Sequence, residues 1–117
     1  MLFRSGFYYR PTVFADVDPQ MRIAQEEIFG PTTALIPVGS FEDAVSAANS
    51  VEFGLSSSIF TRDVNKAFQA MRDLQTGITY INAGTTGAEV HLPFGGMSTS
   101  ARCGAGTGRP LTKEETR

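Results

Sequence analysis

The sequence predicts an α/β fold with a mostly parallel sheet. Three short apolar segments, residues 33–38, 55–60 and 78–82, alternate with two segments whose apolar residues recur every three or four positions. A strand–helix–strand–helix–strand order with short connections is typical of parallel strands joined by right-handed crossovers. A length of 117 residues, of which 41% are hydrophobic, fits one domain.

The first strand is expected at Thr33–Val38, between Pro31 and Gly39. Pro37 has no backbone N–H, which indicates an end or an irregularity of this strand. A helix follows, because the Ser40 hydroxyl can cap its free N–H groups. The apolar residues of this helix fall on one face: Phe41, Ala44, Val45 and Ala48.

The second strand is expected at Leu55–Phe60, where small serines suit burial against helices. Asp63 can cap the next helix, and Gly77 can end it. The buried stripe of that helix is expected at five positions: Val64, Ala67, Phe68, Met71 and Leu74. The third strand, Ile78 to Asn82, has β-branched and aromatic residues. Ligands gather beyond the carboxyl ends of strands in open α/β sheets, so the loop from Asn82 to Gly96 is a candidate site.

Composition and charge exclude several classes of protein. A net charge of −2 gives no reason to expect nucleic-acid or membrane partners. No apolar run approaches the roughly 18 residues that span a bilayer. The single cysteine, Cys103, excludes an internal disulfide and favours a reducing, cytoplasmic location. One histidine, one cysteine and scattered carboxylates lack the spacing of a metal site.

The most informative segment is a turn-forming run, Gln25-Glu26-Glu27-Ile28-Phe29-Gly30-Pro31. Pro31 lacks a backbone N–H and disfavours helical geometry at Gly30, so the segment is expected to be a fixed turn that displays side chains. A carboxylate two residues before an aromatic ring can accept hydrogen bonds from a sugar diol while the ring lies near a flat heterocycle. Glu26 is expected to be structural or exposed.

This run resembles the Glu-Glu-Ile-Phe-Gly-Pro signature of the NAD(P)-dependent aldehyde dehydrogenase superfamily. Residues 53–63, Phe-Gly-Leu-Ser-Ser-Ser-Ile-Phe-Thr-Arg-Asp, resemble the family's Tyr-Gly-Leu-Ala-Ala-Ala-Val-Phe-Thr-x-Asp. Three other segments match in the same order: residues 11–17, 77–82 and 92–96. The resemblance covers residues 6–100 and implies a βαβαβ portion of the family's catalytic domain. The stretch from Gly87 to His91 most resembles the ketoglutarate-semialdehyde branch.

The resemblance implies roles for residues of the turn and of the loop after the last strand. Glu27 would hold the hydroxyls of the nicotinamide ribose of NAD or NADP, and Phe29 would lie beside the nicotinamide; the alternatives are an exposed Glu and a core Phe. Phe94 would line the aldehyde pocket, or else be an ordinary core residue. Thr85 to His91 would form the substrate entrance, where His91 either meets an acidic substrate tail or is a bystander. Asn82 either orients this loop or simply ends the strand.

The resemblance also implies a reaction. In this family a Cys thiolate adds to an aldehyde, hydride passes to NAD(P)+, and the thioester is hydrolysed to a carboxylate. The family's nucleophile and general base lie upstream of the matched segments, so no catalytic residue is assigned here. Cys103 is rejected as the nucleophile, because only Arg102 nearby could lower its pKa. The chain is therefore expected to be an inactive fragment of a homo-oligomeric enzyme; the alternative is a non-catalytic α/β binding or oligomer-docking module.

Both ends depart from the resemblance. Residues 1–5 are expected to be a non-native leader, because Leu2 to Ser5 match the translated end of a common sequencing adapter. After Phe-Gly-Gly the family continues towards a Ser-Gly-x-Gly-Arg-Glu-x-Gly-like run, which a one-base shift near residues 98–101 can restore from codons for Arg102 to Gly108. Residues 101–117 are therefore expected to be a frameshifted or disordered tail, which the nucleotide sequence of the gene tests.

Overall fold

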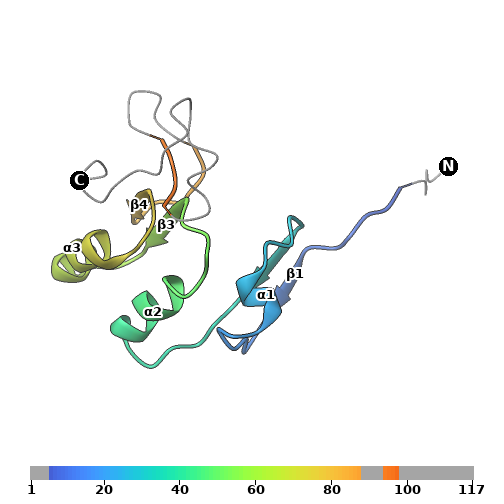
Figure 1. The fold of residues 1–117 in the computed structure, drawn as a ribbon, viewed down its shortest axis with the longest axis horizontal. Coiled ribbons are helices and arrows are strands. Elements are labelled where there is room, and N and C mark those ends of the chain that lie inside the picture. The colour runs from blue at the N-terminus through green and yellow to red at the C-terminus, as the bar shows by residue number, and fades with distance from the viewer. Residues whose placement is uncertain (1–5, 88–93, 98–117) are drawn as a thin grey trace. The chain divides into compact units, whose positions relative to one another are not determined.

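A computed structural model describes residues 6–87 and 94–97 (Figure 1). The chain divides into two compact units, Met1–Val38 and Gly39–Arg117, and each is described by itself. The expectations for residues 1–5 and 101–117 lie outside the described residues.

The first unit is built on one pair of parallel strands. Strand β1, Thr12–Phe14, pairs with strand β2, Thr32–Ala34, with Thr12 opposite Thr32 and Phe14 opposite Ala34. Between them lies α1, Arg22–Gln25, a single helical turn. The pairing extends past both strands, since Thr12 N–H donates to the Pro31 carbonyl (2.9 Å) and Leu35 N–H donates to the Phe14 carbonyl (2.8 Å).

The second unit contains two helices and a second parallel pair. Helix α2, Phe41–Ala48, precedes strand β3, Ser56–Ile59; helix α3, Val64–Asp73, precedes strand β4, Ile78–Ile81. Strands β3 and β4 pair in register from Ser56 opposite Ile78 to Ile59 opposite Ile81. Parallel strands joined through a helix confirm the predicted α/β class.

Both predicted helix caps are confirmed. The Ser40 hydroxyl accepts a hydrogen bond from Asp43 N–H (3.0 Å) at the start of α2. The Asp63 carboxylate accepts from Asn65 N–H (2.9 Å) and Lys66 N–H (3.4 Å) at the start of α3. Each cap satisfies donors that have no partner within the first turn of a helix.

The strands differ from the prediction in extent and pairing. The strand expected at Thr33–Val38 covers residues 32–34, ends before Pro37, and pairs with β1, a segment that the sequence indicated only as a family motif. Within the described residues the strands form two two-stranded sheets. The difference arises because strand pairing joins segments far apart in sequence, whereas the pattern of apolar residues is local.

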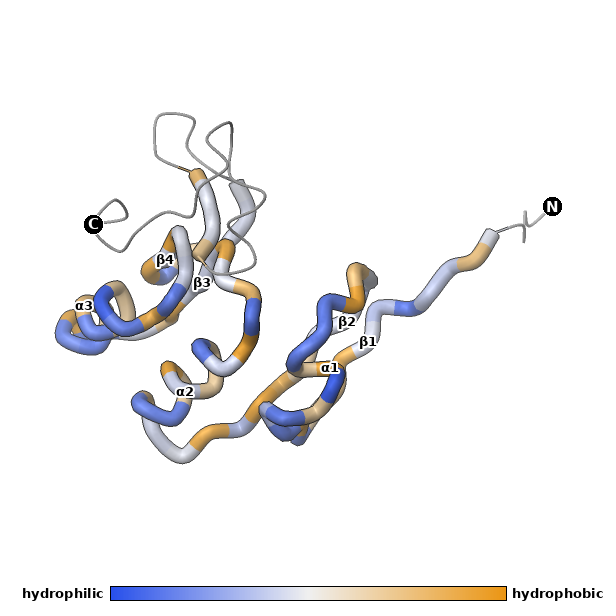
Figure 2. Tube along the Cα trace, in the orientation of Figure 1, coloured by the Kyte–Doolittle hydropathy of each residue, from blue (hydrophilic) through white to orange (hydrophobic). Residues whose placement is uncertain are grey.

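The buried stripe of α3 also differs from the prediction. Ala67, Ala70 and Leu74 are buried where α3 packs near β4. Three residues expected in the stripe are instead largely exposed: Val64 (63%), Phe68 (66%) and Met71 (50%). The small side chains of Ala67 and Ala70 allow the close approach of helix and strand. Figure 2 shows apolar stretches along α2 and α3 and in the segment after β2.

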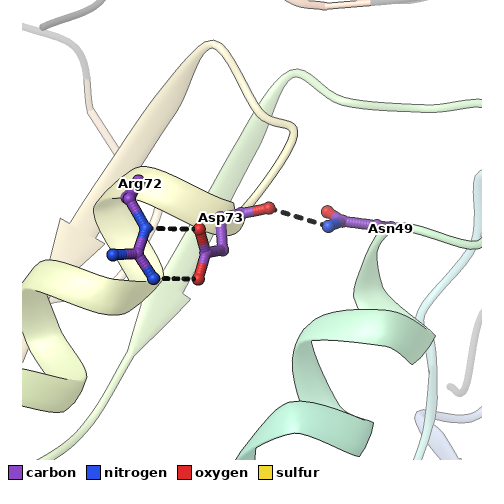
Figure 3. A network of polar contacts seen from close by, with 3 residues as sticks. All are labelled: Asn49, Arg72 and Asp73. Carbon is purple, nitrogen blue, oxygen red and sulfur yellow. Dashed lines mark hydrogen bonds and ion pairs between the residues drawn. The ribbon is translucent and has the colours of Figure 1, made fainter.

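An asparagine joins the ends of the two helices (Figure 3). Asn49, which follows α2, donates from Nδ2 to the Asp73 carbonyl (2.8 Å) and accepts at Oδ1 from Gln75 N–H (2.8 Å). Arg72 forms a two-pronged contact with the Asp73 carboxylate, at 2.7 and 2.9 Å. The amide of Asn49 thereby fixes the connection that leads from α3 into β4.

None of the helices in the described ranges has the length and apolar character needed to cross a membrane.

Candidate functional site

The signature turn lies between α1 and β2 and is held at both ends. Glu26 N–H donates to the Arg22 carbonyl (2.8 Å) at the end of α1, and the Pro31 carbonyl accepts from Thr12 of β1. Thr32 N–H also donates to the Gly30 carbonyl (2.7 Å). These bonds give the fixed turn that Pro31 predicts.

Phe29 is displayed by this turn and is not buried by the described residues. Its φ of +54° lies in the left-handed region, and its side chain is 93% exposed. Left-handed geometry is unfavourable for a bulky residue, and such backbone strain often accompanies function. Within the described residues the Phe29 ring is therefore open to solvent.

Adjacent carboxylates in the turn have different surroundings. Glu26 accepts two hydrogen bonds from the Arg22 guanidinium, both at 2.8 Å, and these bonds lower the pKa of Glu26. Glu27 is exposed, and no hydrogen bond or ion pair engages its side chain within residues 6–87 and 94–97. Glu26 is thus structural, as expected, while the Glu27 oxygens remain able to accept hydrogen bonds.

Glu27 and Phe29 line one open hollow of about 330 Å³. Thr32, Thr33 and Ala34 of β2 form another part of its lining. The chemistry fits the nicotinamide end of a dinucleotide, since a carboxylate suits a ribose diol and an exposed ring suits a flat heterocycle.

The loop after β4 begins at an anchored asparagine. Asn82 has a φ of +54°. Its Oδ1 accepts from Thr61 N–H (2.8 Å), and its Nδ2 donates to the Thr61 carbonyl (2.9 Å). Asn82 follows the last residue of β4, and its amide ties the start of the loop to the residue that follows β3 and Phe60. Thr85 lies exposed in this loop.

Phe94 stands at the other end of the loop and is 43% exposed. The glycines that follow it, Gly95 and Gly96, are buried. The Gly54 carbonyl accepts hydrogen bonds from Gly77 N–H and Met97 N–H, both at 2.9 Å. The returning chain is thereby held at the point where β3 and β4 begin.

Gly54 and Gly77 lie where a side chain would collide with a neighbouring backbone, a requirement not predicted from the sequence. A Cβ on Gly77 would collide with the Gly95 carbonyl, and a Cβ on Gly54 would lie 2.5 Å from the Gln75 carbonyl oxygen. The available signal was a glycine shortly before each strand, which often marks a close approach of two backbones. These two glycines support the site and do not take part in its chemistry.

The predicted site residues fall in both units. The structure brings Glu27 and Phe29 together in the first unit, and places Thr85 and Phe94 in the second. His91 and Cys103 lie outside the described residues. The part of the chain that the structure describes holds no group of three or more His, Cys, Asp or Glu side chains suited to a metal ion.

Comparison with known proteins gives one consistent family. The aldehyde dehydrogenase family matches residues 2–115. The chain is 47% identical over 97 residues to an alpha-ketoglutarate semialdehyde dehydrogenase of Haloferax volcanii, covering 83% of this chain and 20% of the relative. It is 46% identical over 99 residues to the alpha-ketoglutaric semialdehyde dehydrogenase of Bacillus subtilis, covering 85% and 20%. The chain thus spans about a fifth of the length of these relatives.

Solved structures agree with this result. A Thermus 1-pyrroline-5-carboxylate dehydrogenase with bound NAD matches with a TM-score of 0.80 and 41% identity, over 85% of this chain and 19% of that one. A Mycobacterium tuberculosis aldehyde dehydrogenase complexed with NAD+ matches with a TM-score of 0.76 and 46% identity, over 81% and 19%. Family match, sequence identity and fold agree, and the chain belongs to the aldehyde dehydrogenase family.

Proposed function

We propose that this chain is the segment of an NAD(P)-dependent aldehyde dehydrogenase that holds the nicotinamide end of the cofactor and forms one wall of the aldehyde pocket. The observation that carries the proposal is the joint display of Glu27 and Phe29 in one hollow. An unpaired carboxylate beside a nearly fully exposed ring has no evident structural use in the described fold, whereas a ribose diol and a flat heterocycle would engage both.

In this proposal each residue has one task. Glu27 accepts hydrogen bonds from the ribose hydroxyls, and Phe29 confines the nicotinamide. When bound, NAD or NADP supplies the hydride acceptor. Phe94, Thr85 and His91 bound the space for the aldehyde, and His91 faces the acidic tail of a semialdehyde substrate. The overall reaction oxidises an aldehyde to a carboxylate through a Cys thioester, with nucleophile and base supplied by polypeptide outside the matched motifs.

The semialdehyde substrate is proposed from the names of the relatives from Haloferax volcanii and Bacillus subtilis. We further propose a cytoplasmic homo-oligomer for the intact enzyme, on the single cysteine and the family resemblance. Size-exclusion chromatography of the intact enzyme with light scattering tests the oligomer, and a monomeric mass would contradict it.

A hybrid enzyme tests the role of Glu27. In the hybrid, residues 6–97 replace the aligned segment of the Bacillus subtilis relative. Glu27→Gln removes a charged acceptor, and hydrogen bonds to charged groups contribute roughly 1.5–3 kcal/mol. We expect the KM for NAD+ to rise by roughly tenfold or more.

The matched control is Glu52→Gln, an exposed carboxylate that does not line the hollow. It should leave the KM for NAD+ nearly unchanged. Equal effects of the two substitutions, or no effect of Glu27→Gln, would contradict the assignment.

The chain alone is expected to be inactive. It carries the proposed cofactor clamp and one pocket wall without the nucleophile motif. Spectrophotometric assay of the purified 117-residue chain with semialdehydes and NAD+ or NADP+ should show no formation of reduced cofactor. Turnover by the chain alone would overturn this prediction.

A second candidate function is a non-catalytic docking module. The exposed apolar residues of α3, Val64, Phe68 and Met71, favour it because they offer a surface to another polypeptide. Co-purification of the chain with the full-length Bacillus subtilis relative tests this candidate. Failure to bind at micromolar concentration would exclude docking on that enzyme.

A further inference from the structure

Strands β3 and β4 present two hydroxyl groups on one face of the second sheet. Ser58 and Tyr80 are opposite each other in the register. Side chains of directly paired residues in adjacent strands project to the same face of the sheet. Both side chains are half-buried, and both are aimed at the loop that follows β4.

Each hydroxyl donates to a different carbonyl of that loop. Ser58 Oγ donates to the Ala83 carbonyl (2.5 Å), and the Tyr80 hydroxyl donates to the Gly87 carbonyl (2.6 Å). The two acceptors flank Thr85 on either side. Gly87 has a φ of +89°, a geometry that glycine adopts without strain and that directs the chain at this point.

Asn82 provides the third attachment, through its two hydrogen bonds to Thr61. The segment 82–87 is therefore held at its start, at Ala83 and at Gly87. The strand segment around Ser58 resembles a family motif with alanine at this position, and alanine could not make the bond to Ala83. The attachment is thus a property of this chain's own residues.

We propose that Ser58, Tyr80 and Asn82 form a bracket that fixes loop 83–87 and so sets which aldehydes the enzyme accepts. The proposal rests on the proposed function, since Thr85 shapes the substrate entrance only in an aldehyde dehydrogenase. The three are positioning residues: Ser58 and Tyr80 donate to the loop backbone, Asn82 ties the start of the loop to Thr61, and none of these bonds engages the Thr85 side chain. Their loss would widen the range of loop positions and weaken discrimination between short and long aldehydes.

The hybrid enzyme with residues 6–97 of this chain allows a two-part test. Ser58→Ala and Tyr80→Phe each remove one hydroxyl and little else. Hydrogen exchange of the backbone amides at the end of β4, read at Asn82 N–H, which donates to the Ile59 carbonyl (2.7 Å), should be roughly threefold to tenfold faster in each variant, because the loop that follows is less firmly held. The KM of a four- or five-carbon semialdehyde should rise roughly threefold to tenfold, while the KM for NAD+ stays constant.

Two further variants separate positioning from general damage. Ser56→Ala changes the same strand at a hydroxyl that makes no hydrogen bond within the described residues, and it should alter neither readout. Ser58→Thr keeps the hydroxyl and should preserve both. Unchanged exchange in both Ser58→Ala and Tyr80→Phe would overturn the bracket. Faster exchange with unchanged aldehyde KM would overturn its role in selectivity.

Failure of the proposed dehydrogenase function can be distinguished from failure of the bracket. If the unmodified hybrid neither binds NAD+ nor oxidises aldehydes, the proposed function fails and the selectivity role fails with it. The exchange measurement on the same proteins still decides whether the bracket holds the loop.

Discussion

At the scale of single residues, two adjacent glutamates in one turn have different surroundings. Glu26 follows α1 and lies four positions after Arg22, which places both groups on one side of the helical turn. Glu27 is one position further along the chain and does not contact Arg22 through a hydrogen bond or ion pair. The family motif in the sequence is sufficient to single out Glu27 as the candidate for binding ribose. The partner of Glu26 depends on the single-turn helix α1, which the sequence did not predict.

The Arg22–Glu26 pair gives a pH prediction. Hydrogen bonding to Arg22 lowers the pKa of Glu26 below its ordinary value, so the folded state favours the ionised form. The stabilising contribution is therefore present above the ordinary pKa, near 4.5, and is lost as the pH falls through the lower pKa of the folded state. Carboxyl NMR titration should show a rise of the Glu26 pKa in Arg22→Gln.

Added salt provides the control for this pair. Both groups are exposed, so salt should screen their attraction, and 0.5 M NaCl should raise the pKa of Glu26 in the unsubstituted chain. The same salt should change the pKa of Glu26 less in Arg22→Gln, where the attraction is already absent. An identical pKa in the chain and in Arg22→Gln would show that the pair does not form in solution.

At the scale of elements, the helix caps could be predicted from neighbouring residues, whereas the pairing of strands could not. Ser40 and Asp63 act as caps within three residues of their partners, so the sequence contains all that is needed to predict them. The pairing of β2 with β1 depends on a segment about 20 residues away, which no periodicity in either strand reveals. Apolar spacing correctly placed Ala67 and Leu74 in the buried stripe of α3. It missed Ala70, and it wrongly included Val64, Phe68 and Met71, which are largely exposed.

The contact between Gly77 and Gly95 gives a prediction for the strand pair. Any Cβ at residue 77 meets a backbone carbonyl, which cannot rotate away as a side chain would. Gly77→Ala should lower the free energy of unfolding of the hybrid enzyme by about 2–3 kcal/mol, as for overpacking in a dense core. Because the displaced group belongs to the loop of Phe94, the KM for aldehyde should rise as well.

Gly84→Ala is the matched control. Its Cβ would have only the Thr86 hydroxyl near it, at 3.8 Å, so the substitution should change the free energy of unfolding by less than about 0.5 kcal/mol. Urea denaturation of both variants measures the difference. Equal stability of Gly77→Ala and Gly84→Ala would contradict the close approach.

At the scale of the whole molecule, the described residues contain too little buried apolar surface to explain a stable domain. The buried apolar side chains are Val17, Ala67, Ala70 and Leu74. Each unit has a pair of parallel strands, and parallel sheets in proteins are ordinarily covered on both faces by helices. The composition predicted enough apolar residues for a core, but composition cannot show whether the chain itself provides the surfaces that cover them.

This imbalance leads to a prediction about the isolated chain. Large apolar side chains such as Phe60 (72% exposed) and Phe68 (66% exposed) remain open to solvent, and a chain spanning a fifth of its relatives lacks most of the polypeptide found in them. The chain alone should bind an apolar fluorescent dye strongly and unfold without a sharp thermal transition. The hybrid enzyme, which supplies the remaining polypeptide, should bind less dye per chain and unfold cooperatively. Weak dye binding with a cooperative transition in the isolated chain would instead favour a self-sufficient docking module, because a module must cover its own core before it can offer a surface to a partner.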